Sequence, residues 1–256
     1  MGCRAGPTGR PVGEWSDRLS SLYLIRHGQA GTRGRYDALS DLGRRQAYLL
    51  GQYLAAQQVP FKALIAGCLN RQRQTADEVW RAYREAGVVV PGIVSDPNWN
   101  EFDMTAVFSE FAPLLSEADP RFKHDYDELL RKLEDAESPI HQAWTDCDTQ
   151  AMRAWMEGRY PCRTESWAAF GRRVLSARRS LGAYQPGDAV AIFTSATPIS
   201  IWIAAALGVS DSHIMRLAGA MYNSAVTTMR LRDDDLMLFS FNGVPHLNEP
   251  QLRTFR

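Results

Sequence analysis

The sequence is poor in cysteine, and its cysteines are not spaced as a binding or cross-linking set. Cys3, Cys68, Cys147 and Cys162 form neither a Cys-x-x-Cys pair nor a cluster with histidine. This spacing argues against a zinc site and against a disulfide framework. It is typical of proteins from a reducing compartment, and we therefore expect a cytoplasmic location.

An excess of charge of one sign is also missing, as is a long apolar run. Lys and Arg number 29, as do Asp and Glu, so the formal net charge is zero. Such a chain has no overall attraction for nucleic acid or an anionic membrane surface. The longest apolar run, Ile199 to Val209, is interrupted by Ser200 and falls short of the roughly 20 residues that a spanning helix needs. We expect a buried core helix there, and neither nucleic acid nor a membrane as a partner.

The amino-terminal segment, residues 1–19, lacks the apolar stretch of a secretory signal, and we expect it to be a disordered leader. Over the whole chain, 45% of the residues are hydrophobic and 23% are charged, as in ordinary globular proteins. Residues 20–256 are then long enough for a single α/β domain with an insertion.

Short apolar runs alternate with amphipathic helical patterns through the first hundred residues and again after residue 164. This alternation predicts a three-layer α/β/α fold with a mostly parallel central sheet. The expected strands are 22–25, 61–66, 88–94 with a break at Pro91, 190–193, and a final hairpin of 225–231 and 236–241 that turns at 233–235. The expected helices are 40–58 with Ser40 as N-cap, 71–86, 165–181, and one that Pro198 opens.

Residues 103–164 interrupt this alternation. They contain no convincing strand but three helical patterns, near 107–117, 124–135 and 141–157, which prolines separate. The segment is too short to bury much of a core by itself. We therefore expect an inserted helical cap rather than an independent domain.

Arg26, His27 and Gly28 come directly after the first buried strand. In open α/β sheets, ligands bind just beyond the carboxyl ends of the strands. A histidine is a nucleophile when a hydrogen bond orients its second ring nitrogen. The guanidinium of an arginine matches phosphate oxygens, and a glycine lets the backbone approach a ligand closely. The tripeptide by itself fits equally a histidine that is bonded to backbone groups at a strand end.

Several segments, taken in order, resemble the histidine phosphatase superfamily, which includes the cofactor-dependent phosphoglycerate mutases and many phosphatases. The resemblance covers about residues 20–100 and 160–250. It implies the fold expected above and His27 as the residue that accepts the phosphoryl group. The segments are Leu24-Ile25-Arg26-His27-Gly28-Gln29-Ala30, Tyr36-Asp37-Ala38-Leu39-Ser40-Asp41-Leu42-Gly43, Leu69-Asn70-Arg71-Gln72-Arg73-Gln74-Thr75-Ala76, Trp99-Asn100-Glu101 and Glu165-Ser166-Trp167-Ala168-Ala169-Phe170.

Arg71 matches the second phosphate-binding arginine of that family. It falls in the first turn of a helix after a strand, so its guanidinium and the helix N-terminus can face one anion. With Arg26 it would neutralise the phosphoryl oxygens beside His27, which is most of what phosphoryl transfer requires. We expect no cofactor and no metal, because the arginines supply the positive charge. Arg73 is the alternative to Arg71, although a solvated helix face also explains it.

Glu101 stands where the family has its general acid. A carboxyl group in the pocket can protonate the leaving oxygen of a phosphate ester. Asp103 is the alternative acid, and a solvated loop carboxylate is the structural alternative for Glu101.

Ser195 departs from the family pattern, because it occupies the position of a second histidine. A serine can donate a hydrogen bond to a phosphoryl oxygen but carries no charge, and a charge-assisted bond is roughly twice as strong as a neutral one. Alternatively, Ser195 or Thr197 caps the helix that Pro198 opens. The expected catalytic residues are His27 and Glu101, and the expected substrate-binding residues are Arg26, Gly28, Arg71 and Ser195.

Four other histidines are candidates for the missing positive charge, but none is favoured. His124 and His141 lie in the expected cap, and His213 and His246 lie near later strand ends. His246 belongs to an Asn-x-x-x-His-Leu ending that resembles a structural feature of the family.

Two functions stay open. The first is a histidine acid phosphatase-type enzyme that hydrolyses a small phosphomonoester through a phosphohistidine, slowly because Ser195 replaces the second histidine. The second is a non-catalytic phosphate-ligand-binding or interaction protein of the same fold, which the same replacement favours. A mutase is less favoured, because it must protect the intermediate from water with a site short of one cation. The expected ligand is a small phosphorylated substrate or inorganic phosphate. The sequence leaves the substrate and the oligomeric state open, a homodimer included.

Overall fold

The computed structural model describes residues 20–31, 37–135, 138–232 and 235–255. The expected leader, residues 1–19, and most of the expected turn at 233–235 lie outside these ranges. A sheet of six strands forms the centre, in the order β3-β2-β4-β1-β5-β6. The strands are β1 (Ser20–Arg26), β2 (Phe61–Ala66), β3 (Ile93–Ser95), β4 (Ala189–Thr194), β5 (Val226–Arg232) and β6 (Asp235–Gly243).

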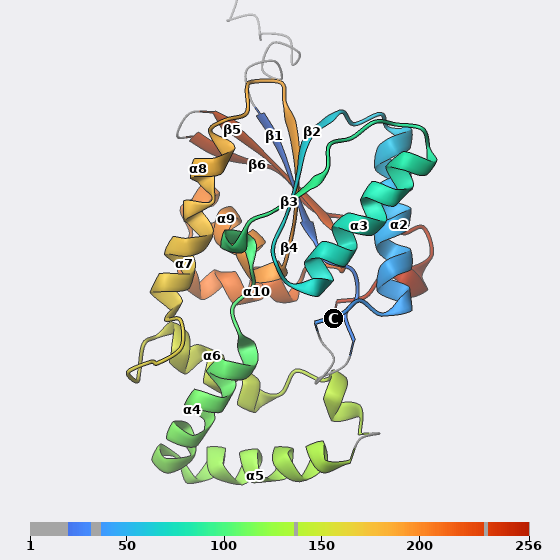
Figure 1. Ribbon diagram of the computed structural model, residues 1–256. Coiled ribbons are helices and arrows are strands. Elements are labelled where there is room, and N and C mark those ends of the chain that lie inside the picture. The colour runs from blue at the N-terminus through green and yellow to red at the C-terminus, as the bar shows by residue number, and fades with distance from the viewer. Residues whose placement is uncertain (1–19, 32–36, 136–137, 233–234, 256) are drawn as a thin grey trace, which may run out of the picture.

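The sheet is parallel on one side and antiparallel on the other. β4 pairs in parallel with both β1 and β2, and β2 pairs in parallel with β3. β5 runs antiparallel to β1, and β6 runs antiparallel to β5. The carboxyl ends of β1 to β4 therefore meet at one edge of the sheet, which is the lower edge in Figure 1.

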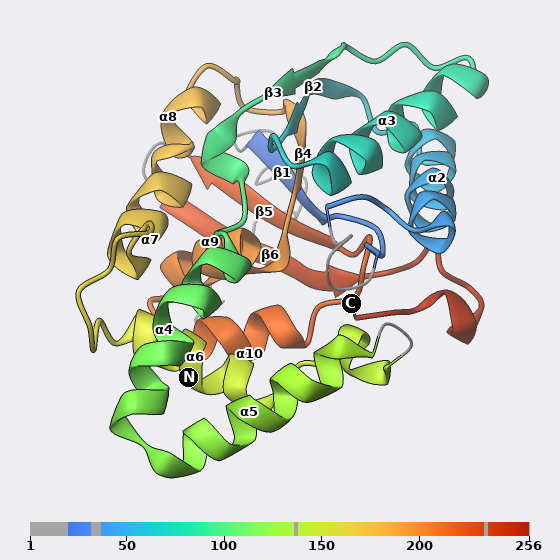
Figure 2. The same ribbon diagram turned by 60° about the horizontal axis from the view of Figure 1, so that its bottom comes forward.

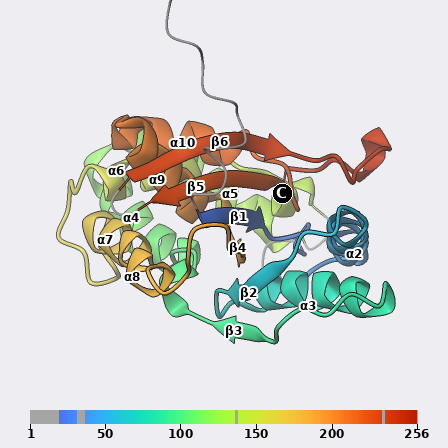
Figure 3. The same ribbon diagram turned by 90° about the horizontal axis from the view of Figure 1, so that it is seen from above.

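Helices cover both faces of the sheet, as Figure 3 shows from above. α2 (Asp41–Ala56) and α3 (Asn70–Glu85) pack on one face, and α7 (Trp167–Ser176), α8 (Arg178–Leu181), α9 (Ala196–Leu207) and α10 (Ile214–Gly219) pack on the other. Leu24 of β1 lies in the core beneath the second group, whereas the adjacent Ile25 lies in the core beneath α2 and α3. This is the alternation that a strand buried on both faces requires. The expected three-layer α/β/α fold is thus confirmed.

Local chemistry explains where the two helices nearest the site begin. The Oγ atom of Ser40 accepts a hydrogen bond of 3.1 Å from the backbone N–H of Gly43, so Ser40 caps α2 as expected. In α9, Pro198 occupies the third position of the first turn, where a missing N–H breaks no helical bond. The residues of α9 from Ala196 to Ala204 are all buried, as expected of a core helix.

Three helices lie beyond the carboxyl ends of the parallel strands, as Figures 1 and 2 show. They are α4 (Met104–Ala118), α5 (Pro120–Glu134) and α6 (Asp146–Met156), and the described residues between 103 and 164 form no strand. Phe111 and Trp155 from these helices are buried in the same apolar cluster as Ile192 of β4. The three helices and the sheet therefore share one core.

The single-turn 3-10 helices complete the described elements. They are η1 (Pro97–Trp99), η2 (Pro139–Gln142), η3 (Asp211–His213) and η4 (Pro250–Leu252). Within the described ranges, no helix combines the length and the apolar character needed to cross a membrane.

Three expected boundaries are wrong. The helix expected near 141–157 begins only at Asp146, because Thr145 caps it: the Oγ1 atom of Thr145 accepts a 3.2 Å hydrogen bond from the N–H of Asp148. The strand expected over 88–94 is reduced to Ile93–Ser95, because Pro91 has no N–H to donate and Val89 is 96% exposed. The single helix expected over 165–181 is divided at Ala177 into α7 and α8. α7 begins only after Ser166, whose Oγ atom accepts a hydrogen bond from the N–H of Ala169 and caps the helix.

Candidate phosphoryl-transfer site

His27 follows β1 directly, at the edge where the parallel strands end, and its side chain is buried. Its Nδ1 atom lies 2.7 Å from the carbonyl oxygen of Gly28. A carbonyl oxygen only accepts hydrogen bonds, so Nδ1 carries the proton and the lone pair of the neutral ring belongs to Nε2. The backbone is fixed as well, because the N–H of His27 donates to Thr194 and its carbonyl accepts from the N–H of Ser224.

The surroundings keep the His27 ring neutral. Burial lowers the pKa of His27 well below its usual value, and the positive charges of Arg71 and Arg26 lower it further. The bond to Gly28 acts in the opposite direction but does not outweigh them. A neutral imidazole with its lone pair on Nε2 is the form that can attack phosphorus.

Gly28 is expected to let the backbone approach a ligand, but the structure gives a different reason for a glycine at this position. A Cβ atom at Gly28 would lie 2.3 Å from the carbonyl oxygen of Gly43, at the start of α2. The close approach is thus to the chain's own backbone. The N–H of Gly28 donates to the Oγ1 atom of Thr75 on α3, and this bond ties the loop after His27 to a second helix.

Arg26 is buried beside His27, and its guanidinium donates to backbone carbonyl groups. Nη1 donates to the carbonyl of Met221, and Nη2 lies 2.6 Å from the carbonyl oxygen of Phe255. The segment that carries Phe255 is held in place, because the N–H of Asn223 donates to the carbonyl of Thr254 at 2.7 Å. No sequence pattern indicated this contact between the first strand and the last residues.

Arg71 lies in the first turn of α3 with its side chain buried, whereas Arg73, the alternative, is exposed on the same helix. The Nη1 atom of Arg71 lies 3.4 Å from the Oδ1 atom of Asp37, whose side chain is 53% exposed. The other oxygen of Asp37 accepts a 2.7 Å bond from the side-chain amide of Asn70. The carboxylate of Asp37 thus lies against Arg71, the arginine that the sequence predicts to bind a phosphate anion.

Glu101 follows η1 and faces the first turn of α9. Its Oε2 atom accepts a 3.2 Å hydrogen bond from the N–H of Thr197, and Oε1 accepts one of 3.2 Å from the N–H of Phe102. Burial raises the pKa of Glu101 above its usual value, although the charge of Arg71 and the bonds from Thr197 and Phe102 oppose the shift. The carboxyl group therefore keeps its proton to higher pH than a solvated glutamate, as a general acid must.

Asp103, the alternative acid, has a structural task. Its Oδ1 atom accepts a 2.9 Å hydrogen bond from the N–H of Ala106 and caps α4. The residue is exposed.

Ser195 occupies the N-cap position of α9, but its side chain does not cap the helix. The expectation that Ser195 or Thr197 supplies the cap is wrong, because the carboxylate of Glu101 accepts the bond from the N–H of Thr197 instead. The Oγ atom of Ser195 accepts a 2.9 Å bond from the Nε2 atom of Gln72. The residue is fully buried and stands one position after β4, in line with the carboxyl ends of the other parallel strands.

The other histidines have separate surroundings. His124 is exposed on α5, His213 lies against the hydroxyl groups of an exposed serine turn, and the Nε2 atom of His141 donates to the carbonyl of Asp135. His246 is buried, and its Nε2 atom lies 2.8 Å from the Oγ atom of Ser224. Burial lowers the pKa of His246 to about 4, so this histidine is neutral near neutral pH. None of these contacts brings a second imidazolium to His27.

Sequence reasoning missed Gln72, Asp37 and the carbonyl of Phe255. Gln72 and Asp37 lie within the segments that resemble the family, and Gln72 directly follows Arg71, so polar neighbours of a motif were the usable signal. Phe255 had no comparable signal. Across the described ranges, no three His, Cys, Asp or Glu side chains are grouped so that they could hold a metal ion.

Comparisons with known proteins identify the family and the fold. The model of the histidine phosphatase superfamily (branch 1) matches residues 22–140 and 131–243. The mitochondrial serine/threonine-protein phosphatase Pgam5 of Caenorhabditis briggsae is 28% identical over an alignment of 127 residues that covers 43% of this chain. The match spans only 45% of that relative.

Solved structures show the same fold at lower identity. YhfR of Bacillus stearothermophilus superposes with a TM-score of 0.60 at 20% identity, over 90% of this chain and 100% of its own. A phosphoglycerate mutase of Bacillus anthracis gives a TM-score of 0.58 at 16% identity, over 91% of this chain and 97% of its own.

Proposed function

The chain belongs to the histidine phosphatase superfamily, and on that premise we propose that it hydrolyses a small phosphomonoester through a phosphohistidine at His27. One observation carries the proposal. The 2.7 Å bond from Nδ1 to the carbonyl of Gly28 assigns the lone pair of the buried ring to Nε2. The lowered pKa of His27, caused by burial and then by Arg71 and Arg26, keeps that lone pair available in mildly acidic solution.

In the first step, the Nε2 atom of His27 attacks phosphorus. The N–P bond forms while the bond from phosphorus to the ester oxygen breaks, and the electron pair of that bond stays on the leaving oxygen. Glu101 gives its proton to this oxygen, so the leaving group departs as an alcohol. Arg26 and Arg71 neutralise the phosphoryl oxygens, and Ser195 is a neutral donor beside them.

In the second step, water hydrolyses the phosphohistidine. The carboxylate of Glu101 accepts a proton from the water molecule as its oxygen attacks phosphorus. The N–P bond breaks, inorganic phosphate leaves, and the electron pair returns to Nε2 of His27. Glu101 is again protonated, so the cycle is closed.

Two features of the site favour an alternative function, which is binding of a phosphorylated ligand without catalysis. Ser195 cannot carry charge, and the guanidinium of Arg26 already donates to the carbonyl of Phe255 at 2.6 Å. A protein with this site could bind a phosphorylated ligand without turning it over. The buried, oriented His27 and the raised pKa of Glu101, which comes from burial, favour the enzyme, because binding alone requires neither.

The proposed substrate is a small phosphomonoester, and inorganic phosphate is the proposed product. The similar Pgam5 is named as a serine/threonine-protein phosphatase, but the matched part is less than half of that protein. We place the activity in the cytoplasm, on the cysteine pattern of the sequence.

Turnover of p-nitrophenyl phosphate between about pH 4 and pH 8 tests the proposal, with the His27→Ala protein as the blank. We expect slow turnover that His27→Ala abolishes. If the protein binds vanadate but both proteins show the same background rate, the binding function stands and the enzyme does not.

A further inference from the structure

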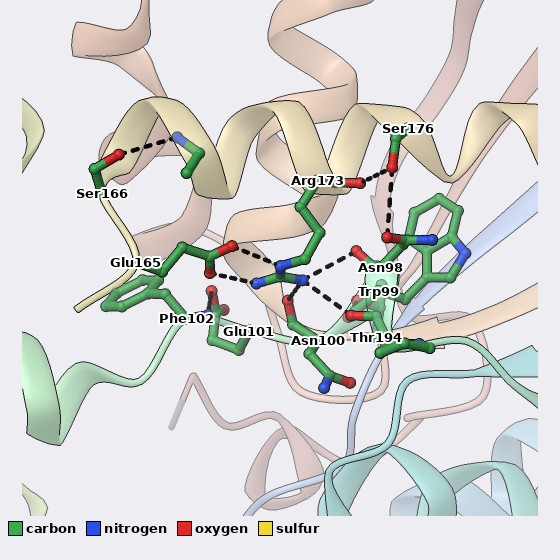
Figure 4. Close-up of polar contacts among 12 residues, drawn as sticks. Asn98, Trp99, Asn100, Glu101, Phe102, Glu165, Ser166, Arg173, Ser176 and Thr194 are labelled. Atoms are coloured by element: carbon green, nitrogen blue, oxygen red, sulfur yellow. Dashed lines mark hydrogen bonds and ion pairs between the residues drawn. The ribbon is translucent and has the colours of Figure 1, made fainter. Parts of the chain in front are cut away.

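The segment that leads to Glu101 is held through its backbone carbonyl groups by one arginine from α7. The Nη1 atom of Arg173 lies 3.0 Å from the carbonyl oxygen of Pro97, 3.3 Å from that of Asn98 and 3.1 Å from that of Asn100. Figure 4 shows these contacts converging on a single guanidinium. The carbonyl group of Asn100 belongs to the peptide bond that joins it to Glu101, so the clamp reaches the backbone of the proposed acid.

The remaining carbonyl group of the segment, that of Trp99, is held from the opposite side. It accepts bonds of 3.1 Å from the Nε2 atom of Gln72 and 2.5 Å from the Oγ1 atom of Thr194. Gln72 is the residue that also donates to Ser195. The segment is thus fixed between α7 on one side and β4 and α3 on the other.

Glu165 orients the arginine. Its two carboxylate oxygens lie 2.8 Å and 2.7 Å from the Nε and Nη2 atoms of Arg173, in a bidentate pair. This geometry fixes the plane of the guanidinium and directs Nη1 at the carbonyl groups. The carbonyl of Glu165 in turn accepts a 2.9 Å bond from the indole of Trp155 on α6, so the pair is attached to the helices beyond the sheet.

The residue after Glu101 is anchored by packing. The ring of Phe102 lies 4.7 Å from that of Trp155 and 5.5 Å from that of Phe170. Beside this anchor, however, a cavity of about 280 Å³ opens, with Glu101 and Arg173 in its wall. Packing does not fill this space, so the hydrogen bonds of Arg173 hold the side of the loop that faces α7.

We propose that Arg173, oriented by Glu165, is a positioning residue that holds the carboxyl group of Glu101 where it can protonate the leaving oxygen. The inference rests on the proposed function. A general acid works only within hydrogen-bond reach of the oxygen, and a displacement of about 1 Å can cost roughly 10²-fold in rate. Arg173 contacts Glu165, the ring of Phe170 and backbone carbonyl groups, none of which takes part in the proposed reaction, so its proposed effect passes through the position of Glu101.

The leaving group separates this role from a merely structural one. Nitrophenolate is a stable anion that departs with little help from an acid, whereas the alkoxide of glycerol 2-phosphate needs a proton. Arg173→Gln should therefore lower kcat on glycerol 2-phosphate at least about tenfold more than kcat on p-nitrophenyl phosphate, a part of the about 10²–10⁴-fold that a general acid contributes. Arg172→Gln, which removes an exposed neighbour on the same helix, should leave both rates unchanged.

Three further variants keep the test decisive. Glu165→Gln should reproduce the selective loss, and the double variant should lose no more than Arg173→Gln alone, because both act through one contact. Arg173→Lys should recover part of the loss, since the charge remains but the fork does not. If Arg173→Gln does not fold, as judged by its thermal transition, Glu165→Gln and Arg173→Lys carry the comparison.

The outcomes are distinguishable. Folded variants that lose both rates equally, or neither, overturn the positioning role while His27-dependent turnover by the unmodified protein upholds the proposed function. Absence of His27-dependent turnover on both esters in the unmodified protein overturns the proposed function and the role of Arg173 with it.

Discussion

The Oγ atom of Ser195 lies 2.9 Å from the Nε2 atom of Gln72, the residue that follows Arg71 on α3. This bond ties the position where the resemblance predicts a second histidine to the helix that carries the second arginine. Ser195 is fully buried and lacks charge. The proposed transition state is therefore short of one positive contact.

Ser195→His should accelerate turnover of p-nitrophenyl phosphate. Loss of one pre-organised donor typically costs about 10²–10³ in kcat, and restoring it as an imidazolium should recover part of that factor. The gain should be largest below the pKa of the new imidazole and fade as the pH rises past it, because only the protonated ring carries charge. Ser195→Asn is the matched control, since it fills space without adding charge. A Ser195→His protein that folds and binds vanadate but is no faster near about pH 5–6 would show that the position does not limit catalysis.

Arg71 and Arg73 should differ in oxyanion binding. Vanadate at about 100 times its Kd should stabilise the protein by about 2.7 kcal/mol, seen as a higher Tm. Arg71→Ala should abolish this rise, whereas Arg73→Ala, which removes an exposed side chain from the same helix, should retain it. The reverse result would mean that the anion sits elsewhere on α3.

Asp37 should weaken anion binding. Its carboxylate lies 3.4 Å from the Nη1 atom of Arg71, and an anion at Arg71 has to approach that negative charge. Asp37 is half exposed, although Arg71 is buried, and solvent at the carboxylate weakens the pair. Taking the about 0.2–1 kcal/mol of exposed pairs, Asp37→Asn should tighten phosphate binding by about 1.4- to 5-fold. Asp41→Asn, at the exposed start of α2, is the control. Titration calorimetry with phosphate measures the change, and weaker binding by Asp37→Asn would show that Asp37 orders the site instead.

The ionised carboxylate of Glu101 should destabilise the folded protein at neutral pH, although catalysis requires this residue. Burial raises the pKa of Glu101 in the folded protein above its value in the unfolded chain. Folding therefore favours the protonated carboxyl, and this contribution to stability is complete below the unfolded pKa and is lost as the pH rises through the folded pKa. Glu101→Gln should accordingly raise Tm at neutral pH and lose that advantage in acid, while kcat on glycerol 2-phosphate falls by about 10²–10⁴-fold. Equal Tm differences at both pH values would contradict the raised pKa.

Much of the architecture could be predicted from local patterns. The apolar run Phe61–Ala66 is a strand with the expected ends, and Ser40 caps α2, because burial and capping are decided by nearby residues. The apolar run from Val88 to Val90 also predicts a strand, but the structure forms none there. Position at the edge of the sheet and Pro91 prevent these residues from pairing with β2. An apolar run does not show whether its residues find a pairing partner or are exposed to solvent.

The placement of the candidate site residues was predictable where they follow strand ends, and not where distant segments meet. The parallel strands bring His27, Arg71 and Ser195 to one edge, as the topology requires. The contacts of Arg26 with Phe255 and of Arg173 with Asn100 join residues that are 229 and 73 positions apart. Backbone carbonyl groups accept these bonds. Every residue has such a group, so the sequence does not indicate which of them will accept a bond.

The central claim is that phosphorus becomes bonded to His27. The most direct measurement is a rapid alkaline quench during turnover of a radiolabelled phosphate ester, followed by mass spectrometry of the peptide that contains residues 22–31. A phosphohistidine is stable to alkali and labile to acid, so we expect label on His27 that survives the quench and disappears on acidification. Turnover without label on His27, retained at full rate in His27→Ala, would contradict the claim.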